Sequence, residues 1–235
     1  MDTAGPQTPA PAEAIAEGWV ELQAADGHRL KAWAAPPAAS PKGRVVVLQE
    51  LFGVNAHMRS VTAACARAGY AALAPALFDR VERDVSLGYD KAALDHGLAL
   101  RNALPPDRVL LDVDAALHLD GAPGTAIVLG FCWGGTLAWL AASRLPVRAA
   151  GAYYGGQIGD PLDQRPRAPV LAHFGRHDHS IPLAVPDALM RDHPTVLTHL
   201  YAAGHGFNGG ERSSHDPASA ELAWRRTLSF LDAVS

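Results

Sequence analysis

The chain has 235 residues, of which 49% are hydrophobic and 19% are charged, a composition that excludes an intrinsically disordered protein. Its formal net charge of −4 leaves no excess of Lys and Arg for phosphate groups, so we expect no nucleic-acid partner. Two cysteines, Cys65 and Cys132, are too few for a disulfide framework or a zinc site of four thiolates. A single disulfide and a single reactive thiol both stay open at this point.

The first residues, 1–17, are rich in Ala, Pro and Thr and lack both a basic start and an apolar run. They predict a mobile tail and not a signal peptide, followed by a single domain over 18–235 in the cytoplasm. Residues 121–143 carry no charge and are long enough to cross a bilayer. Pro123 and the pair Gly134-Gly135 favour a buried strand, a turn and a helix instead, so we expect no membrane contact.

Hydrophobic periodicity then predicts the elements in chain order. Residues 19–22 and 29–35 resemble edge strands joined by a turn at Asp26-Gly27. Strands and helices alternate afterwards, with strands at 44–49, 70–75, 125–129, 149–154, 170–174 and 195–202, and helices at 57–68, 89–103, 105–120, 134–143, 184–191 and 218–233. This alternation indicates an α/β fold, with a mostly parallel twisted sheet and helices on both faces. In such sheets ligands bind beyond the carboxyl ends of the strands.

A nucleophile motif follows the predicted strand at 125–129. The sequence Gly130-Phe131-Cys132-Trp133-Gly134 has the G-x-S-x-G pattern with Cys in place of Ser. Glycines at both ends of the motif let strand and helix cross closely, and the helix N-terminus favours a thiolate and an oxyanion near the Trp133 N–H. The alternative is that Cys132 is a small buried hydrophobic residue, the role we expect for Cys65 on the apolar stripe of a helix.

An acid and a base follow later strands in the order expected for a catalytic triad. Asp178 comes directly after the strand at 170–174, and His205 lies between glycines after the strand at 195–202. His205 would deprotonate the thiol of Cys132 while Asp178 orients the ring. Asp187 and Asp192 are weaker candidates for the acid, and a capping Asp or a structural His is the alternative interpretation.

The cluster of His173, His177, Asp178 and His179 also suggests a metal site. Two of these histidines are four residues apart, and they would need a helix to share one face. The local pattern is strand and then turn, so the rings should diverge. We therefore expect neither a metal nor another cofactor.

Glu50 ends the first buried parallel strand and is expected to face the cleft, although a solvated loop glutamate would have the same pattern. The N–H of the following Leu51 is a candidate for the second oxyanion donor. Phe52 and Phe207, which lie beside these polar residues, are expected to contact the substrate.

These residues together resemble the dienelactone hydrolase family of α/β-hydrolases, the carboxymethylenebutenolidases. The likeness covers about residues 18–233 and is carried by the motifs Q-E-L-F-G-V-N at 49–55, A-P-A-L-F-D-R at 74–80, G-F-C-W-G-G at 130–135, G-R-H-D at 175–178 and G-H-G-F-N at 204–208. The resemblance implies the α/β-hydrolase fold and a Cys132–His205–Asp178 triad that forms an acyl-cysteine. It also implies that Glu50 contacts the resting thiol and helps to convert it to the thiolate.

The resemblance further implies that Arg80 binds a carboxylate of the substrate. A second family arginine is expected four residues after the catalytic histidine, where this chain has Gly209; Arg212 lies three residues further on and is a candidate replacement. Ala76 stands where the family usually has Asp. These departures weaken the case for dienelactone itself more than the case for ester hydrolysis.

The leading functional prediction is a thiol-dependent hydrolase of small lactones or esters that carry a carboxylate, acting as a monomer by default. An acyltransferase or thioesterase would use the same acyl-cysteine with a different acceptor. A non-catalytic ligand-binding module is a third alternative, which the complete triad argues against.

Overall fold

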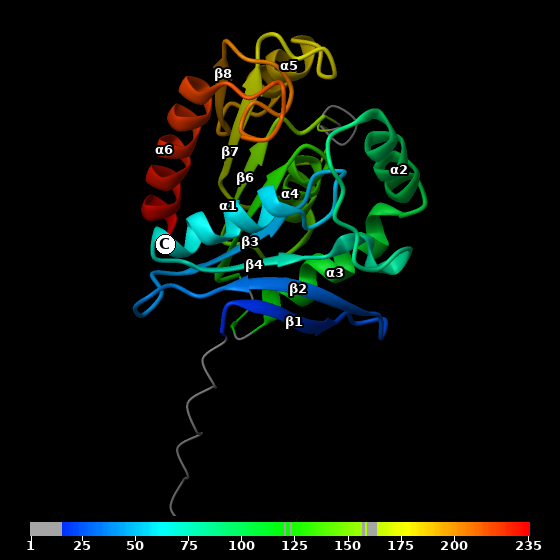
Figure 1. Cartoon of the computed structure of the whole chain (residues 1–235). Helices are drawn as coiled ribbons and strands as arrows, with labels where there is room; N and C mark the ends of the chain where they lie inside the picture. Colours follow the sequence, from blue (N-terminus) through cyan, green and yellow to red (C-terminus); the bar gives the residue numbers. More distant parts are fainter. Residues whose placement is uncertain (1–15, 120, 123, 157, 159–163) are drawn as a thin grey trace, which may run out of the picture.

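The computed structural model describes residues 16–119, 121–122, 124–156, 158 and 164–235. The tail predicted at 1–17 lies almost entirely outside the described residues. A twisted eight-stranded sheet runs through the molecule in the order β1-β2-β4-β3-β5-β6-β7-β8 (Figure 1). Its strands are β1 (Gly18–Gln23), β2 (Arg29–Ala35), β3 (Arg44–Leu48), β4 (Ala71–Pro75), β5 (Ala126–Phe131), β6 (Ala149–Tyr153), β7 (Val170–Gly175) and β8 (Leu197–Tyr201).

The sheet is antiparallel at one edge and parallel elsewhere. β2 pairs antiparallel with both β1 and β4, whereas every pair from β4 to β8 is parallel. Because parallel strands need crossover connections, helices cover both faces of the sheet. The expected α/β architecture with a mostly parallel sheet is therefore confirmed.

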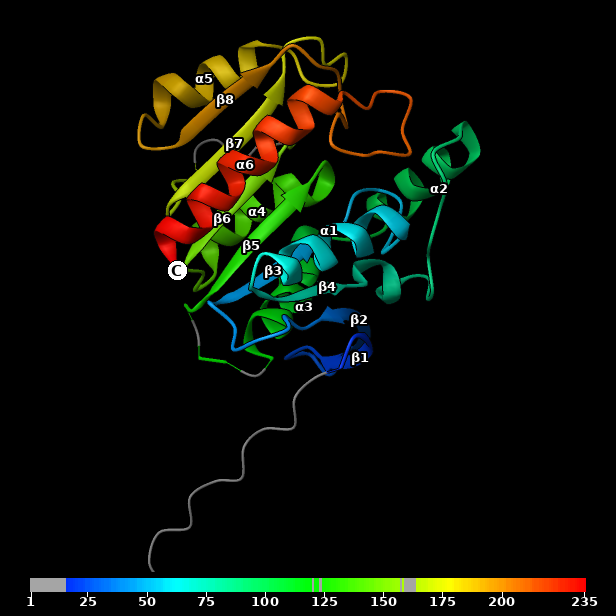
Figure 2. The ribbon, with the colours of Figure 1, turned by 60° about the vertical axis from the view of Figure 1, so that its left-hand side comes forward.

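The helices lie in two layers (Figure 2). α1 and α6 cover one face of the sheet, and α3 and α4 cover the other, while α5 packs against β8. α2 lies to one side of the sheet (Figure 1). Their bounds are α1 (Ala56–Arg67), α2 (Lys91–Asn102), α3 (Pro106–His118), α4 (Trp133–Arg144), α5 (Ala184–Asp192) and α6 (Pro217–Val234).

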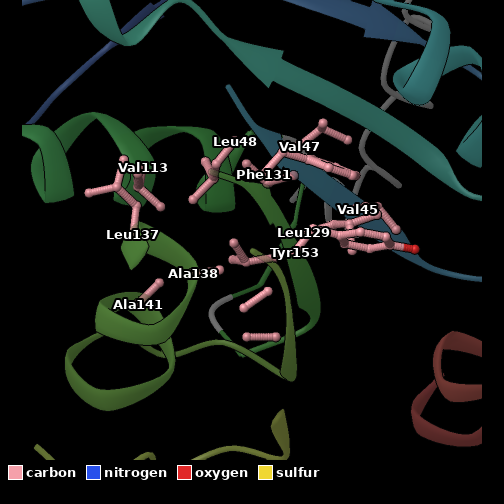
Figure 3. Close-up of a cluster of buried hydrophobic side chains, with 14 of the residues drawn as sticks. Val45, Val47, Leu48, Val113, Leu129, Phe131, Leu137, Ala138, Ala141 and Tyr153 are labelled. Atoms are coloured by element: carbon pink, nitrogen blue, oxygen red, sulfur yellow. The ribbon is translucent and has the colours of Figure 1, made fainter. Parts of the chain in front are cut away.

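The central strands are buried on both faces, which explains their continuous apolar sequences. Val45 and Val47 of β3 lie beside Leu129 of β5, whereas Leu48 points to the opposite face and lies near Leu137 of α4 (Figure 3). This alternation follows from the period of two in a strand. The two apolar layers hold the strand ends in place at the edge where the candidate site residues follow.

Local sequence signals place most element ends. Asp90 accepts a hydrogen bond from the N–H of Ala93 (2.8 Å), so α2 begins at Lys91 and not at the predicted residue 89. The short 3-10 helix η1 (Leu77–Arg80) was not predicted, because four residues are too few to establish a period. The uncharged segment 121–143 contains β5 and all of α4 except its last residue, Arg144. No helix among the described residues is long and apolar enough to cross a membrane.

Candidate functional site

Four polar side chains follow four strands of the parallel part of the sheet. Glu50 comes after β3, Cys132 after β5, Asp178 after β7 and His205 after β8. The carboxyl ends of parallel strands share one edge of a sheet, so residues up to 155 positions apart in sequence meet there. The structure brings Cys132, His205 and Asp178 into one hydrogen-bonded chain.

Cys132 lies at a strained turn between β5 and α4. Its backbone has φ +54° and ψ −116°, a left-handed conformation that non-glycine residues rarely adopt and that costs about 1–3 kcal/mol. The turn is held by the N–H of Cys132, which donates to the carbonyl of Tyr153 (2.9 Å). A Cβ atom at Gly130 would lie 1.9 Å from the carbonyl oxygen of Gly134, so the close crossing of strand and helix requires glycine. The expected sharp turn between strand and helix is thus present in this chain.

His205 connects the thiol to the acid. Its Nε2 lies 3.1 Å from Sγ of Cys132, and its Nδ1 lies 2.8 Å from Oδ2 of Asp178. The other carboxylate oxygen of Asp178 accepts the N–H groups of Ser180 (2.8 Å) and Ile181 (3.1 Å). The Asp178 side chain is completely buried, so these bonds fix its orientation and, through it, the tilt of the imidazole.

The charge state of His205 is set by its two partners. Burial lowers the pKa of His205, but the hydrogen bonds and negative charges of Asp178 and Cys132 outweigh burial and raise the pKa to about 10. An imidazole with this pKa readily accepts the thiol proton and holds it beside a thiolate. The geometry therefore suits general-base activation of a sulfur nucleophile.

Glu50 and Arg212 form a buried ion pair in the same region. Nη1 of Arg212 donates to Oε1 of Glu50 (2.8 Å), and the Glu50 side chain is only 1% exposed. The guanidinium lies over the rings of Phe52 (5.5 Å) and Tyr89 (5.3 Å). The structure gives the Cys132 thiol His205 as its hydrogen-bond partner, whereas the family resemblance suggested Glu50 in the resting enzyme.

Arg80 lies among protein carboxylates. Its guanidinium donates to both oxygens of Asp112 (2.6 and 2.8 Å) and both oxygens of Asp26 (2.8 and 3.1 Å). The Arg80 side chain is 12% exposed, and that of Asp112 is fully buried. This internal network was not expected for a residue predicted to bind the substrate's carboxylate.

Two loops that carry the candidate oxyanion donors are joined by a hydrogen bond. The N–H of Gly134 donates to the carbonyl of Gln49 (3.0 Å), which links the start of α4 to the loop after β3. Leu51 comes two residues after Gln49, and Trp133 directly precedes Gly134. Neither of their backbone N–H groups donates to an acceptor in the described part of the chain.

Tyr154 lies in the candidate site but is not predicted by the sequence motifs. Its ring lies 5.2 Å from that of His205, its hydroxyl is buried, and no described residue is its hydrogen-bond partner. Burial and the charge of Glu50 raise the pKa of Tyr154 well above its usual value, so the phenol stays neutral. Its position directly after β6 is the sequence signal that could have placed Tyr154 at this edge of the sheet. Phe207 is fully buried and packs on Tyr154 (5.4 Å).

The histidine cluster near Asp178 includes one residue of the core. His173 is buried in β7, where its ring nitrogens lie 2.8 Å from the hydroxyl of Tyr201 and 3.1 Å from that of Thr227. Among the described residues, no group of three or more His, Cys, Asp or Glu side chains is arranged to hold a metal ion. Cys65 is buried in α1, and both cysteines are free.

A sequence model of the dienelactone hydrolase family matches residues 30–235. The chain belongs to this family. The enzyme is 34% identical to a protein of Escherichia coli (strain K12) described as "Putative carboxymethylenebutenolidase", over 94% of this chain and 88% of that protein. It is 32% identical to the carboxymethylenebutenolidase of Pseudomonas putida, over 92% of this chain and 96% of the relative.

The structure of this dienelactone hydrolase family member is also similar to that of a solved protein. A crystal structure described as "Putative Dienelactone Hydrolase from Klebsiella pneumoniae" matches with a TM-score of 0.77 and 30% identity, over 90% of this chain and 98% of that one. The α/β-hydrolase fold is thereby confirmed. The enzyme is a hydrolase of lactones or esters, as family membership indicates.

Proposed function

We propose that this hydrolase cleaves small lactones or esters through an acyl-cysteine intermediate on Cys132. The observation that carries the proposal is the hydrogen-bonded chain from Asp178 through His205 to a thiol at a strained strand-to-helix turn. Each group has a role that its surroundings support: Asp178 orients the ring, His205 moves the proton and Cys132 attacks.

In the first half-reaction His205 takes the proton from the Cys132 thiol, and the thiolate attacks the carbonyl carbon of the ester. The N–H groups of Leu51 and Trp133 stabilise the negative oxygen of the tetrahedral intermediate. The carbon–oxygen bond to the leaving group breaks, and His205 donates its proton to the departing alkoxide. The products of this step are an alcohol and an acyl-cysteine.

In the second half-reaction His205 takes a proton from water, and the resulting hydroxide attacks the acyl-cysteine carbonyl. The carbon–sulfur bond breaks, which releases a carboxylic acid and returns the proton to the thiol. A lactone would give both products on one molecule, a hydroxy acid. If an alcohol or thiol replaced water, the same intermediate would give acyl transfer, and product analysis with such acceptors separates the two outcomes.

The test is hydrolysis of 4-nitrophenyl acetate by the wild-type enzyme and by Cys132→Ala. We expect a pre-steady-state burst of nitrophenolate in the wild type and a loss of turnover of about 10³-fold or more in the variant, with an unchanged circular dichroism spectrum. Cys65→Ala is the matched control, because burial raises the pKa of the Cys65 thiol to about 12 and keeps it unreactive. Full activity of Cys132→Ala, or inactivation by iodoacetamide that depends on Cys65, would refute the proposal.

A further inference from the structure

One peptide group joins the turn at Cys132 to the strand that precedes Asp178. The carbonyl of Tyr153, the last residue of β6, accepts a hydrogen bond from the N–H of Cys132 (2.9 Å). The N–H of Tyr154, in the same peptide group, donates to the carbonyl of His173 in β7 (2.7 Å). A displacement of Tyr153 would therefore move the backbone of Cys132 with it.

The backbone next to this connection is strained at two residues. Cys132 has φ +54° and Tyr154 has φ +38°, and only one other non-glycine residue of the described chain has a left-handed φ. Such conformations are unfavourable and persist only where the surrounding structure fixes them. The contacts that hold Tyr153 are therefore part of what keeps Cys132 in its turn.

The side chain of Tyr153 belongs to a chain of hydrogen bonds that crosses from the sheet to α6. Its hydroxyl lies 2.7 Å from Oγ1 of Thr227, and Nε2 of His173 lies 3.1 Å from the same oxygen. The rings of His173 and Tyr153 also pack together, with 4.4 Å between their centroids. Nδ1 of His173 lies 2.8 Å from the hydroxyl of Tyr201 in β8. These four residues, the Tyr153 network, connect β6, β7 and β8, the strands that end beside the triad.

The Tyr153 network is buried and uncharged. Tyr153, His173 and Thr227 have no exposed surface. Burial is the main cause that lowers the pKa of His173 to about 3, and the nearby His199 and Arg226 lower it further. A neutral imidazole has one donor and one acceptor, so both ring nitrogens of His173 are used by its two hydroxyl partners. His173 is therefore a fixed hydrogen-bonding group and not an acid or a base.

Apolar packing alone does not require these polar groups. If both partners of a buried hydrogen bond are replaced by apolar groups of the same shape, the free energy of unfolding can stay nearly the same. A fully satisfied polar network, in contrast, fixes the orientation of each member, because hydrogen bonds are directional. What the hydrogen bonds add here is therefore a single orientation of the Tyr153 side chain.

We propose that the Tyr153 network positions the nucleophile. His173 and Thr227 fix the side chain of Tyr153. The carbonyl of Tyr153 then holds the N–H of Cys132, so that Sγ stays within reach of Nε2 of His205 (3.1 Å). His173 and Thr227 are thus positioning residues that act through Tyr153 and not on the substrate. The proposal rests on the proposed acyl-cysteine function, because only then does the position of this thiol set the rate.

The test compares two variants at one position. Thr227→Val removes the hydroxyl that connects Tyr153 with His173, whereas Thr227→Ser keeps it. We expect kcat for 4-nitrophenyl acetate to fall about 10- to 100-fold in Thr227→Val with little change in KM, since a misplacement of about 1 Å can lower a rate about 10²-fold. The pH at which iodoacetamide alkylation of Cys132 is half-maximal should rise by about one unit, because a displaced thiol loses stabilisation by the imidazole. Thr227→Ser should restore most of both properties.

Thr62→Val is the matched control for the loss of a buried hydroxyl. Thr62 has no exposed surface, and its hydroxyl donates to the carbonyl of Met58 (2.8 Å) within α1. A merely structural role of Thr227 would lower the melting temperature, as in the control, and leave kcat and the alkylation profile of the folded enzyme unchanged. That result would overturn the proposal.

Tyr153→Phe removes the other end of the same hydrogen bond and keeps the ring, so it also tests the proposal if Thr227→Val does not fold. Its kcat should fall as well, and the double variant with Thr227→Val should lose no more than the worse single variant. Losses that multiply in the double variant would refute a shared network.

Failure of this proposal and failure of the proposed function are distinguishable in the same assay. Wild-type kcat in Thr227→Val and Tyr153→Phe, together with loss of turnover in Cys132→Ala, would refute the positioning role and keep the acyl-cysteine function. Turnover that persists in Cys132→Ala would refute the function itself.

Discussion

Gly97 places α2 directly against the loop that carries the proposed oxyanion donor. An ideal Cβ atom at Gly97 would lie 1.9 Å from the carbonyl oxygen of Leu51, whereas real Cβ atoms are almost never closer than 3.0 Å to another heavy atom. In Gly97→Ala, either α2 or the Leu51 loop must therefore move by at least about 1.1 Å, the difference of these two distances.

The effect of Gly97→Ala that we expect from this contact is a loss of activity, whereas helix propensity alone would make the same change favourable. In the interior of a free helix, Gly→Ala is stabilising by about 0.5–1 kcal/mol. A displacement of about 1 Å at a catalytic group can lower the rate by about 10²-fold, and loss of one oxyanion donor has an effect of similar size. We expect kcat/KM of Gly97→Ala to fall about 10- to 100-fold, mainly through kcat.

The assay measures kcat and KM with 4-nitrophenyl acetate, the melting temperature, and the rate at which iodoacetamide alkylates Cys132. Alkylation should stay close to the wild-type rate, because the contact with Leu51 does not involve the triad. Gly88→Ala is the matched control, since a Cβ there meets no atom within 4 Å. The reasoning is refuted if a folded Gly97→Ala enzyme keeps the kcat/KM of the control, or if alkylation falls as much as turnover.

Two further predictions concern charge. The pKa of His205 is raised from 6.5 to about 10, so its positive charge contributes stability that is complete below pH 6.5 and is lost as the pH rises through about 10. In Asp178→Asn, the free energy of unfolding measured with urea should fall less between pH 6.5 and 10 than it does in the wild type. An equal fall in the two proteins would contradict this prediction. Asp112→Asn should lower that free energy at pH 7 by about 2–4 kcal/mol, because it weakens a buried ion pair with Arg80. A loss below about 1 kcal/mol would show that Asp26 alone can hold Arg80.

Much of the site followed from local signals. The apolar run before Gly130 and the glycine at 134 predicted a sharp strand-to-helix turn, and the structure has it with a left-handed Cys132. Asp178 and His205 are predicted because each lies just after a strand, and parallel strands present their carboxyl ends on one edge, where the structure joins both to Cys132 by hydrogen bonds. Tyr154 has the same position after β6 and was missed, since a tyrosine after a strand has many structural roles.

The partners of the arginines could not be predicted in this way. Arg80 is 54 residues from Asp26 and 32 from Asp112, and Arg212 is 162 residues from Glu50. No period or motif relates such positions, because these pairs depend on which face each helix turns toward the sheet. The contact of Gly97 with Leu51 likewise depends on how α2 packs.

Local patterns were thus sufficient for most of the strands and helices, the sheet type and the order of the proposed triad, because backbone geometry and apolar spacing act over a few residues. The charge balance that surrounds the nucleophile was decided by tertiary packing. Side chains far apart in the chain are buried together there, and burial makes each charge depend on its nearest partner. A family motif therefore locates an arginine in the sequence. The carboxylates that surround that arginine are decided by the fold.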